Sequence, residues 1–261
     1  MLKILQISDL HILSEPSATL LGINTDYYFQ QVLAAAHSQH GPFDLLLLTG
    51  DLAQETSVAS YERILSTLQS YPTPCLCLPG NHDDEVLMQS ILNTPQVSSD
   101  RQMQFGNWQI ICLNSRQPGT PVGYLAKAEL QFLEQRLTAQ PDAPTMLALH
   151  HHCISSGSPW MDTMQLQNSP ELLAIVDKHP QLKIVTFGHV HQVITSRYRH
   201  VAVFSAPATC FQFQPFATEM AVTEESPGYR LFELAADGGY TTDCYRLSEP
   251  LLGLDHNSHS Y

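Results

Sequence analysis

The sequence predicts an α/β fold, in which two packed, mixed β-sheets are flanked by helices within a single domain. Up to residue 188, apolar runs of strand length alternate with helical patterns, which favours right-handed βαβ units and a mostly parallel sheet. After residue 188, short strand-like runs follow one another and predict antiparallel strands of a second sheet packed on the first. With 261 residues, the chain is long enough to bury a large core.

Six apolar runs define the expected strands of the first sheet. In several of them apolar residues are consecutive and do not alternate with polar ones, which is typical of strands covered on both faces. The expected strands are Lys3–Ile7, Phe43–Thr49, Pro74–Leu78, Trp108–Leu113, Thr145–Leu149 and Lys183–Phe187.

Apolar residues at helical spacing lie between these strands. They predict helices over Tyr27–His40, Tyr61–Leu68 and Ala126–Leu137. A further helix is expected to begin at Ser169, with Ser169 as the N-cap and Pro170 in the first turn.

The last part of the chain predicts short strands at His200–Ser205, Tyr229–Leu234 and Tyr240–Arg246. The segment 236–239 (Ala-Asp-Gly-Gly) is typical of a hairpin turn and would join the last two. Because no Pro-, Gly- or Ser-rich linker divides the chain, we expect one domain over residues 1–250, followed by a polar tail over residues 251–261.

The composition bears on partners and location. The net charge of −13, from 12 basic and 25 acidic residues, argues against electrostatic binding of nucleic acid or anionic membranes. The six cysteines form no C-x-x-C pair, so reduced, buried thiols are expected. The N-terminus begins with a strand pattern and lacks the zones of a signal peptide, and no apolar run approaches about 18 residues. These features predict a cytoplasmic protein whose oligomeric state the sequence leaves open.

Five short segments rich in metal-binding side chains follow apolar runs. Since the carboxyl ends of parallel strands meet at one edge of a sheet, we expect these side chains to lie together, as a two-metal hydrolytic site requires. The segments are Asp9-Leu10-His11, Gly50-Asp51, Gly80-Asn81-His82, His150-His151-His152 and Gly188-His189-Val190-His191.

The spacing and chemistry of these residues indicate the kind of metal. Asp9 and His11 are two residues apart, so in extended backbone both side chains point to the same side, and His189 and His191 repeat this spacing. Carboxylate, imidazole and amide ligands suit Fe, Mn, Co, Ni or Zn better than Mg or Ca. No cysteine belongs to the segments, which argues against a closed structural zinc site.

This pattern resembles the calcineurin-like metallophosphoesterase superfamily, whose motifs run D-x-H, G-D, G-N-H-[DE], H and G-H-x-H. All five motifs are present, with Asp83 completing the third. Within the superfamily the chain is most similar to the bacterial 3′,5′-cyclic-AMP phosphodiesterases, through the segments LLGINT (20–25), TGDLAQ (49–54), LPGNHD (78–83), HHH (150–152), SPWMD (158–162) and ATCFQFQP (208–215).

The resemblance implies two divalent metal ions per chain, preferably Fe or Mn, with Zn, Co and Ni as further candidates. Asp51 would bridge the two ions. One ion would also be bound by Asp9, His11 and His191, and the other by Asn81, His150 and His189. The histidine triplet leaves a choice between His150, which ends the strand, and His151.

Two cations about 3.5–4 Å apart can lower the pKa of a shared water toward about 7, which yields a bridging hydroxide that attacks the phosphorus. His82 is then the candidate general acid for the leaving oxygen, with Asp51 or Asp83 as its partner. The alternative role for His82 is packing behind the ligands. The polar residues expected to contact substrate are His11, Asp51, Asn81, His82 and His191. Phe211 and Phe213 are expected aromatic contacts, and Trp160 is a further candidate. Each of these rings would either stack on a purine or fill an apolar seam between loops.

The expected activity is hydrolysis of 3′,5′-cyclic AMP to 5′-AMP, and the expected partner is therefore a small molecule. The first alternative is a phosphodiesterase for other small diesters, such as glycerophosphodiesters. A non-catalytic module with the same fold and a phosphoprotein phosphatase are weaker alternatives, because every ligand is present and no extra segment suggests a protein-binding groove. A P-loop ATPase is excluded by the absence of its G-x-x-x-x-G-K-[ST] motif.

Overall fold

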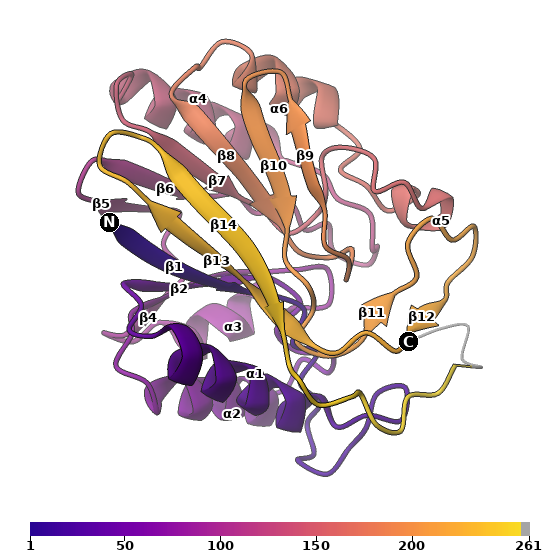
Figure 1. Cartoon of the computed structure of the whole chain (residues 1–261). Helices are drawn as coiled ribbons and strands as arrows, with labels where there is room; N and C mark the ends of the chain where they lie inside the picture. The colour runs from indigo at the N-terminus through magenta and orange to yellow at the C-terminus, as the bar shows by residue number, and fades with distance from the viewer. Residues whose placement is uncertain (257–261) are drawn as a thin grey trace.

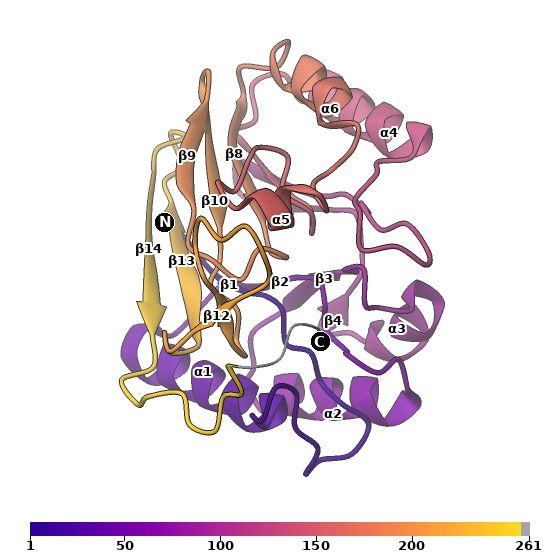
Figure 2. The same ribbon diagram turned by 90° about the vertical axis from the view of Figure 1, so that its right-hand side faces the viewer.

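The computed structural model describes residues 1–256, and its strands form two six-stranded sheets packed face to face (Figures 1 and 2). Helices cover the outer face of each sheet, so the layers run helix, sheet, sheet, helix. This arrangement confirms the predicted α/β fold with two mixed sheets. None of the helices in the described part of the chain is long and apolar enough to cross a membrane.

The first sheet combines parallel strands from the N-terminal part of the chain with a C-terminal hairpin. β1, β2, β3 and β4 are parallel, whereas β13 is antiparallel to β1 and to β14. In spatial order the strands are β14 (Tyr240–Arg246), β13 (Gly228–Leu234), β1 (Leu2–Ile7), β2 (Leu45–Thr49), β3 (Cys75–Leu78) and β4 (Val97–Ser98).

The second sheet is also mixed. β6, β7, β8 and β10 are parallel, and the two edge strands are antiparallel to their neighbours. In spatial order the strands are β5 (Gln102–Phe105), β6 (Trp108–Cys112), β7 (Thr145–Ala148), β8 (Leu182–Phe187), β10 (Val201–Ser205) and β9 (Thr195–Tyr198). A separate small hairpin consists of β11 (Gln212–Phe213) and β12 (Val222–Thr223).

The assignment of strands to sheets differs from the prediction. The six strands expected in one sheet are divided three and three, and β13 and β14 extend the first sheet instead of forming the second. β10 pairs parallel with β8, although an antiparallel strand was expected there. The predicted hairpin turn is present, with Gly238 at φ +88°. Hydrophobic patterns indicate which residues of a strand are buried, but not which strands pair with each other. The predicted and the observed arrangement of strands therefore agree equally well with the pattern.

Six helices lie in the described residues. Those in the first part of the chain cover the first sheet, and α4 and α6 cover the second (Figure 1). Asn168, and not Ser169, precedes the last helix, and Ser169 is its first residue. The sequence prediction missed α3 and α5. The helices are α1 (Thr25–His40), α2 (Val58–Gln69), α3 (Glu85–Leu92), α4 (Lys127–Ala139), α5 (Pro159–Asp162) and α6 (Ser169–Val176).

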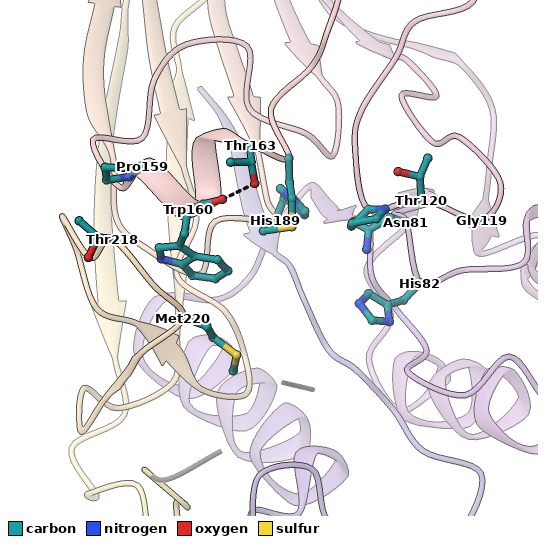
Figure 3. A pocket seen from close by; sticks show the side chains of 12 residues that line it. Asn81, His82, Gly119, Thr120, Pro159, Trp160, Thr163, His189, Thr218 and Met220 are labelled. Atoms are coloured by element: carbon teal, nitrogen blue, oxygen red, sulfur yellow. Dashed lines mark hydrogen bonds between the residues drawn. The ribbon is translucent and has the colours of Figure 1, made fainter. Parts of the chain in front are cut away.

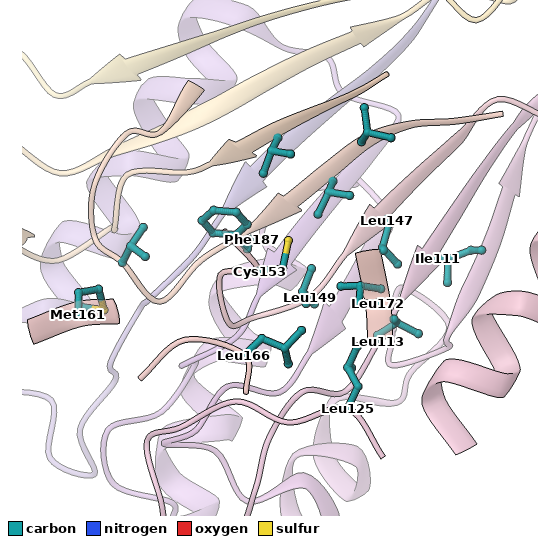
Figure 4. Close-up of a cluster of buried hydrophobic side chains, with 14 of the residues drawn as sticks. Ile111, Leu113, Leu125, Leu147, Leu149, Cys153, Met161, Leu166, Leu172 and Phe187 are labelled. Carbon is teal, nitrogen blue, oxygen red and sulfur yellow. The ribbon is translucent and has the colours of Figure 1, made fainter. Parts of the chain in front are cut away.

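Apolar side chains fill the space between the layers. Ile4 and Phe232 of the first sheet pack with Ile110 and Phe204 of the second, and all are buried. A further cluster lies between the second sheet and its helices (Figure 4). Burying apolar side chains on both faces of each sheet stabilises it by about 25 cal/mol per Å² of apolar area. The sheets therefore form a firm support for the loops at their ends.

The segment after β14 returns to the first half of the chain. Leu252 N–H donates to the Tyr28 hydroxyl at 2.9 Å, and Asp255 N–H donates to the Leu21 carbonyl at 2.9 Å. The first part of the expected polar tail is thus fixed on the protein, whereas residues 257–261 lie outside the described residues. The boundary at residue 250 stays a prediction.

Candidate metal centre

The predicted ligands follow directly on five strands, three in the first sheet and two in the second. β1, β2 and β3 lead to Asp9, Asp51 and Asn81, and β7 and β8 lead to His150 and His189. The centre therefore lies where corresponding ends of both sheets meet. No single sheet carries all of the ligands, which explains why the two sheets have to pack together for the centre to form.

The backbone at these strand ends is unusual. Asp9, His11, Asp51, His189 and His191 have φ values of +56°, +49°, +50°, +67° and +45°. Left-handed backbone is unfavourable for residues with a side chain and concentrates at functional sites. The extended backbone predicted for the Asp9/His11 and His189/His191 pairs is wrong, because each strand has ended and the chain turns sharply. The paired side chains nevertheless reach one centre.

Glycines allow these turns to approach one another closely. A Cβ on Gly80 would lie 2.2 Å from Asp51 Oδ1, and one on Gly188 would lie 2.0 Å from the Ser8 hydroxyl oxygen. Both distances are far below van der Waals contact. A side chain at either position would therefore push the ligand-bearing turns apart.

The carboxylate of Asp51 lies between two groups of ligands. Its Oδ2 is 3.2 Å from His150 Nε2 and 3.8 Å from His11 Nε2. On the side of His11, His191 Nε2 lies 3.2 Å from His11 Nε2 and 3.5 Å from Asp9 Oδ1. This geometry fits a carboxylate shared between two metal positions.

The other group contains His150, Asn81 and His189. His150 Nε2 is 3.1 Å from Asn81 Oδ1, and the rings of His150 and His189 are 5.0 Å apart. Both ring nitrogens of His189 are buried without a hydrogen-bond partner among the described residues. Buried polar atoms are almost always satisfied, so these atoms fit cations as their missing partners.

Three of the histidines are oriented in the same way. In each, Nδ1 is held by an oxygen of a neighbouring segment, which leaves Nε2 directed at the centre. A hydrogen bond of this kind fixes the tautomer and the ring orientation of a metal ligand. The acceptors are Gln54 Oε1 for His11 at 2.7 Å, the Thr49 carbonyl for His150 at 2.8 Å and the Phe211 carbonyl for His191 at 2.9 Å.

Electrostatics in the centre follow from burial and from the mixture of charges. Burial lowers the pKa of His11 to about 3, so its imidazole is neutral near pH 7. Burial also opposes charge on His150, but Asp51 outweighs this effect and raises the pKa of His150 to about 9. Burial alone would raise the pKa of Asp51, whereas His150 and His82 lower it well below its usual value. Asp51 is thus an ionised carboxylate surrounded by imidazoles.

The structure distinguishes His150 from its neighbour His151. Both ring nitrogens of His151 have protein partners: the Ser115 hydroxyl donates to Nδ1 at 2.8 Å, and Nε2 donates to the Pro121 carbonyl at 3.2 Å. His150 instead directs Nε2 toward two other candidate ligands, Asp51 Oδ2 at 3.2 Å and Asn81 Oδ1 at 3.1 Å. This difference favours His150 over His151, although His151 also groups with His150 and His189, and the choice of ligand stays a prediction.

Asp83 has a role that the sequence did not suggest. Its carboxylate accepts hydrogen bonds from the backbone N–H groups of Leu52, Ala53 and Gly80 at 3.1, 3.0 and 2.8 Å, and from the Tyr61 hydroxyl at 2.9 Å. It therefore joins the turn after Asp51 to the turn before Asn81. With these partners, Asp83 positions the two loops, and its pairing with the His82 ring stays a prediction.

A cavity of about 770 Å³ opens at the centre, a size typical of small-molecule sites. Asn81, His82 and His189 line its metal side, and Trp160 and Met220 line the opposite side (Figure 3). His82 also approaches the ligands, since a ring nitrogen lies within 4.8 Å of ligand atoms of His11 and Asp51. The remaining lining residues are Gly119, Thr120, Pro121, Pro159, Thr163, Met164 and Thr218.

A model of the family described as "Calcineurin-like phosphoesterase" matches residues 2–193, which include every ligand candidate described above. The chain belongs to the calcineurin-like phosphoesterase family. The fold agrees with solved structures of this kind. A dimetal phosphatase from Danio rerio superposes with a TM-score of 0.63 at 10% identity, covering 88% of this chain and 94% of that one.

Relatives of this phosphoesterase with greater sequence similarity extend over nearly the whole chain. A 3′,5′-cyclic-nucleotide phosphodiesterase from Nostoc is 41% identical over 94% of this chain and 92% of its own length. The 3′,5′-cyclic adenosine monophosphate phosphodiesterase CpdA from Escherichia coli is 37% identical over 99% of this chain and 94% of its own length.

Two predicted substrate contacts of this phosphoesterase lie apart from the cavity lining. Phe211 and Phe213 are buried, with ring centroids 5.0 and 4.5 Å from that of His191. Neither belongs to the residues that line the cavity. Stacking of these rings on a purine stays a prediction, whereas their packing against His191, a candidate ligand, is observed.

We expect Gln54→Ala to weaken metal binding by this phosphoesterase by about 10- to 100-fold, the usual effect of removing an outer partner of a ligand histidine. Without Gln54 Oε1, the His11 ring loses the hydrogen bond that orients it. Metal affinity measured by competition with a chelator tests this effect. Gln131→Ala, on the exposed surface of α4, is the matched control and should retain the original affinity. An unchanged affinity in Gln54→Ala would contradict the assigned role.

Proposed function

We propose that this phosphoesterase hydrolyses 3′,5′-cyclic AMP to 5′-AMP at a two-metal centre. The observation that carries the proposal is the position of Asp51 Oδ2 between His11 of one ligand group and His150 of the other. The names of the Nostoc and E. coli relatives support the class of substrate. The partner is accordingly a small molecule, and the cavity beside the centre has a suitable size.

We assign one metal position to Asp9, His11 and His191, and the other to Asn81, His150 and His189, with Asp51 shared between them. This set of carboxylate, imidazole and amide donors suits Fe or Mn, and also Zn, Co or Ni. When bound, two such ions supply an activated water nucleophile at neutral pH and offset negative charge on the phosphate.

The side chains of this protein orient the substrate and manage its protons. Asp51 accepts a hydrogen bond from the His82 backbone N–H at 2.8 Å, so the carboxylate that would be shared between the metal positions also fixes the start of the His82 loop. His82 lines the cavity beside the ligands, where its ring can donate a proton to the departing 3′ oxygen. Release of that oxygen leaves the phosphate on the 5′ carbon, which yields 5′-AMP.

The charge of the protein is compatible with this substrate. A cyclic diester carries one negative charge, which two dications can offset without a basic surface, and the net charge of the chain is −13. The same charge is the basis for expecting neither nucleic-acid nor membrane partners. These expectations and the cytoplasmic location stay predictions.

Turnover of a substrate panel by the metal-reconstituted protein tests the proposal. The panel contains cyclic AMP, cyclic GMP, 2′,3′-cyclic AMP, glycerophosphocholine and a phosphate monoester. We expect the highest kcat/KM for a 3′,5′-cyclic nucleotide, with 5′-AMP as the product from cyclic AMP. A higher kcat/KM for glycerophosphocholine would favour the alternative activity toward other small diesters.

A further inference from the structure

The cavity wall that faces the metal side is apolar and uncharged. It is formed by α5 with the residues after it, and by the loop between β11 and β12 (Figure 3). Trp160 and Met220 lie on this side, opposite Asn81 and His82. The residues of this wall, here called the α5 wall, are Pro159, Trp160, Thr163, Met164, Thr218 and Met220.

Asp162 anchors one end of the α5 wall. Its Oδ1 accepts hydrogen bonds from the Ser156 backbone N–H at 2.7 Å and hydroxyl at 2.6 Å, and its Oδ2 accepts from the Ser155 hydroxyl at 2.5 Å. Oδ1 also lies 3.3 Å from His152 Nε2, two residues beyond His150. The wall is thereby attached to the segment that carries a metal ligand.

Ser158 anchors the other end of the wall. Its hydroxyl accepts hydrogen bonds from the Phe216 backbone N–H at 2.9 Å and from Gln192 Nε2 at 3.2 Å. Gln192 follows His191, and Phe216 belongs to the loop between β11 and β12. The buried Ser158 side chain therefore connects the segment after His191 with the loop between β11 and β12. The SPWMD segment is therefore held at both ends by hydrogen bonds.

The Trp160 ring is packed in a defined orientation. It meets Phe213 edge to face, with centroids 4.9 Å apart, and Phe213 in turn stacks on His191. The indole Nε1 is buried and has no hydrogen-bond partner among the described residues, so this atom is not presented to the cavity. A ligand in the cavity would therefore contact the apolar part of the Trp160 ring.

We propose that Trp160, supported by Met164 and Met220, is the surface on which the nucleobase of the substrate packs, an inference that rests on the proposed function. A tryptophan ring provides a large, rigid face for stacking a purine, and thioethers adapt to its edges. The wall lies across the cavity from the metal side, so a base on Trp160 leaves the phosphate free to face the metal ligands.

The α5 wall also limits how well one purine is distinguished from another. Apart from the buried indole N–H of Trp160, its polar side-chain groups are the hydroxyls of Thr163 and Thr218, and the Thr163 hydroxyl already donates to the Trp160 carbonyl at 2.6 Å. It has no carboxylate, amide or guanidinium to bond the edge of a base. Apolar pockets discriminate between similar ligands by roughly 100-fold or less, so kcat/KM for cyclic AMP and cyclic GMP should differ by less than about 100-fold.

The test compares kcat/KM of the metal-reconstituted wild type and Trp160→Ala on cyclic AMP, cyclic GMP and methyl 4-nitrophenyl phosphate, a diester without a base. We expect Trp160→Ala to lose about 10-fold or more on both cyclic nucleotides, mainly through KM, because stacking is lost. Turnover of the aryl diester should change by less than about 3-fold, since the metal ligands are intact. Trp160→Phe should recover most of the loss. Tyr27→Ala removes a ring that is 47% exposed on α1 and outside the cavity lining, and it should behave as wild type.

Fluorescence provides a readout that a folding defect alone does not mimic. The chain has two tryptophans, and Trp108 is buried in β6, so quenching of Trp160 by added 5′-AMP should disappear in Trp160→Phe. Equal losses on all three substrates in Trp160→Ala, or selective losses only in Phe211→Ala or Phe213→Ala, would overturn the assignment. A cyclic AMP preference above about 100-fold would overturn recognition by stacking alone. Failure of the wild type to hydrolyse either cyclic nucleotide, with turnover of the aryl diester retained, would instead remove the proposed function and this inference with it.

Discussion

Asp51→Asn is expected to lower kcat/KM by more than about 100-fold and to weaken the binding of both metal ions. Loss of a residue that only hydrogen-bonds to a ligand costs up to about 100-fold, and loss of the shared ligand itself should cost more. Asp51 Oδ2 lies between His150 Nε2 and His11 Nε2 at 3.2 and 3.8 Å. An amide preserves the size of the side chain but removes the negative charge that two cations would share. Metal analysis after dialysis, together with turnover, measures both effects.

Asp243→Asn is the matched control for this substitution, because Asp243 is exposed on β14 and lies outside the metal centre. Its metal content and turnover should equal those of the wild type. Two tightly held ions and near-normal turnover in Asp51→Asn would rule out a shared carboxylate.

His82→Ala is expected to retain both metal ions and to slow hydrolysis of diesters with poor leaving groups by about 10²–10⁴-fold. A sugar oxygen departs with difficulty unless it receives a proton, whereas a nitrophenolate departs without one. The rate on an activated aryl diester should therefore fall much less than the rate on cyclic AMP. The test measures the ratio of the rate on cyclic AMP to the rate on the aryl diester for wild type and His82→Ala. Both rates are measured at saturating metal, and the metal content of each protein is determined in parallel.

The position of His82 also permits a different outcome. Its ring nitrogen lies within 4.8 Å of ligand atoms of His11 and Asp51, which is close enough for a ligand. Loss of a metal ion in His82→Ala, or equal losses on both substrates, would assign His82 to metal binding or structure. His200→Ala, on the surface between β9 and β10, should leave both rates unchanged.

The ligand candidates could be predicted because each is encoded locally. A strand pattern followed by a metal-binding side chain identifies Asp9 or His189 without knowledge of the remaining chain. Sheet membership could not be predicted in this way, because a buried strand such as β10 shows the same pattern in a parallel or antiparallel pair. The division of the first six strands between two sheets depends on long-range pairing, which leaves no local signal.

The supporting contacts were also beyond the reach of sequence patterns. The Phe211 carbonyl holds His191, so the side chain of Phe211 carries no sign of this role. Gln54 could have been noticed, since it lies three residues after Asp51 in the TGDLAQ segment, but nothing in its type identifies His11 as its partner. Trp160 was one of three candidate aromatic rings, and only the fold shows that it alone of the three lines the cavity.

The most direct test of the two-metal account is a titration of metal-free protein with Mn²⁺ while cyclic AMP hydrolysis is followed. The account predicts no turnover without metal, full turnover at two ions per chain and 5′-AMP as the product, because both ligand groups around Asp51 must be filled. Full turnover at one ion per chain, or turnover that persists without any metal, would contradict it.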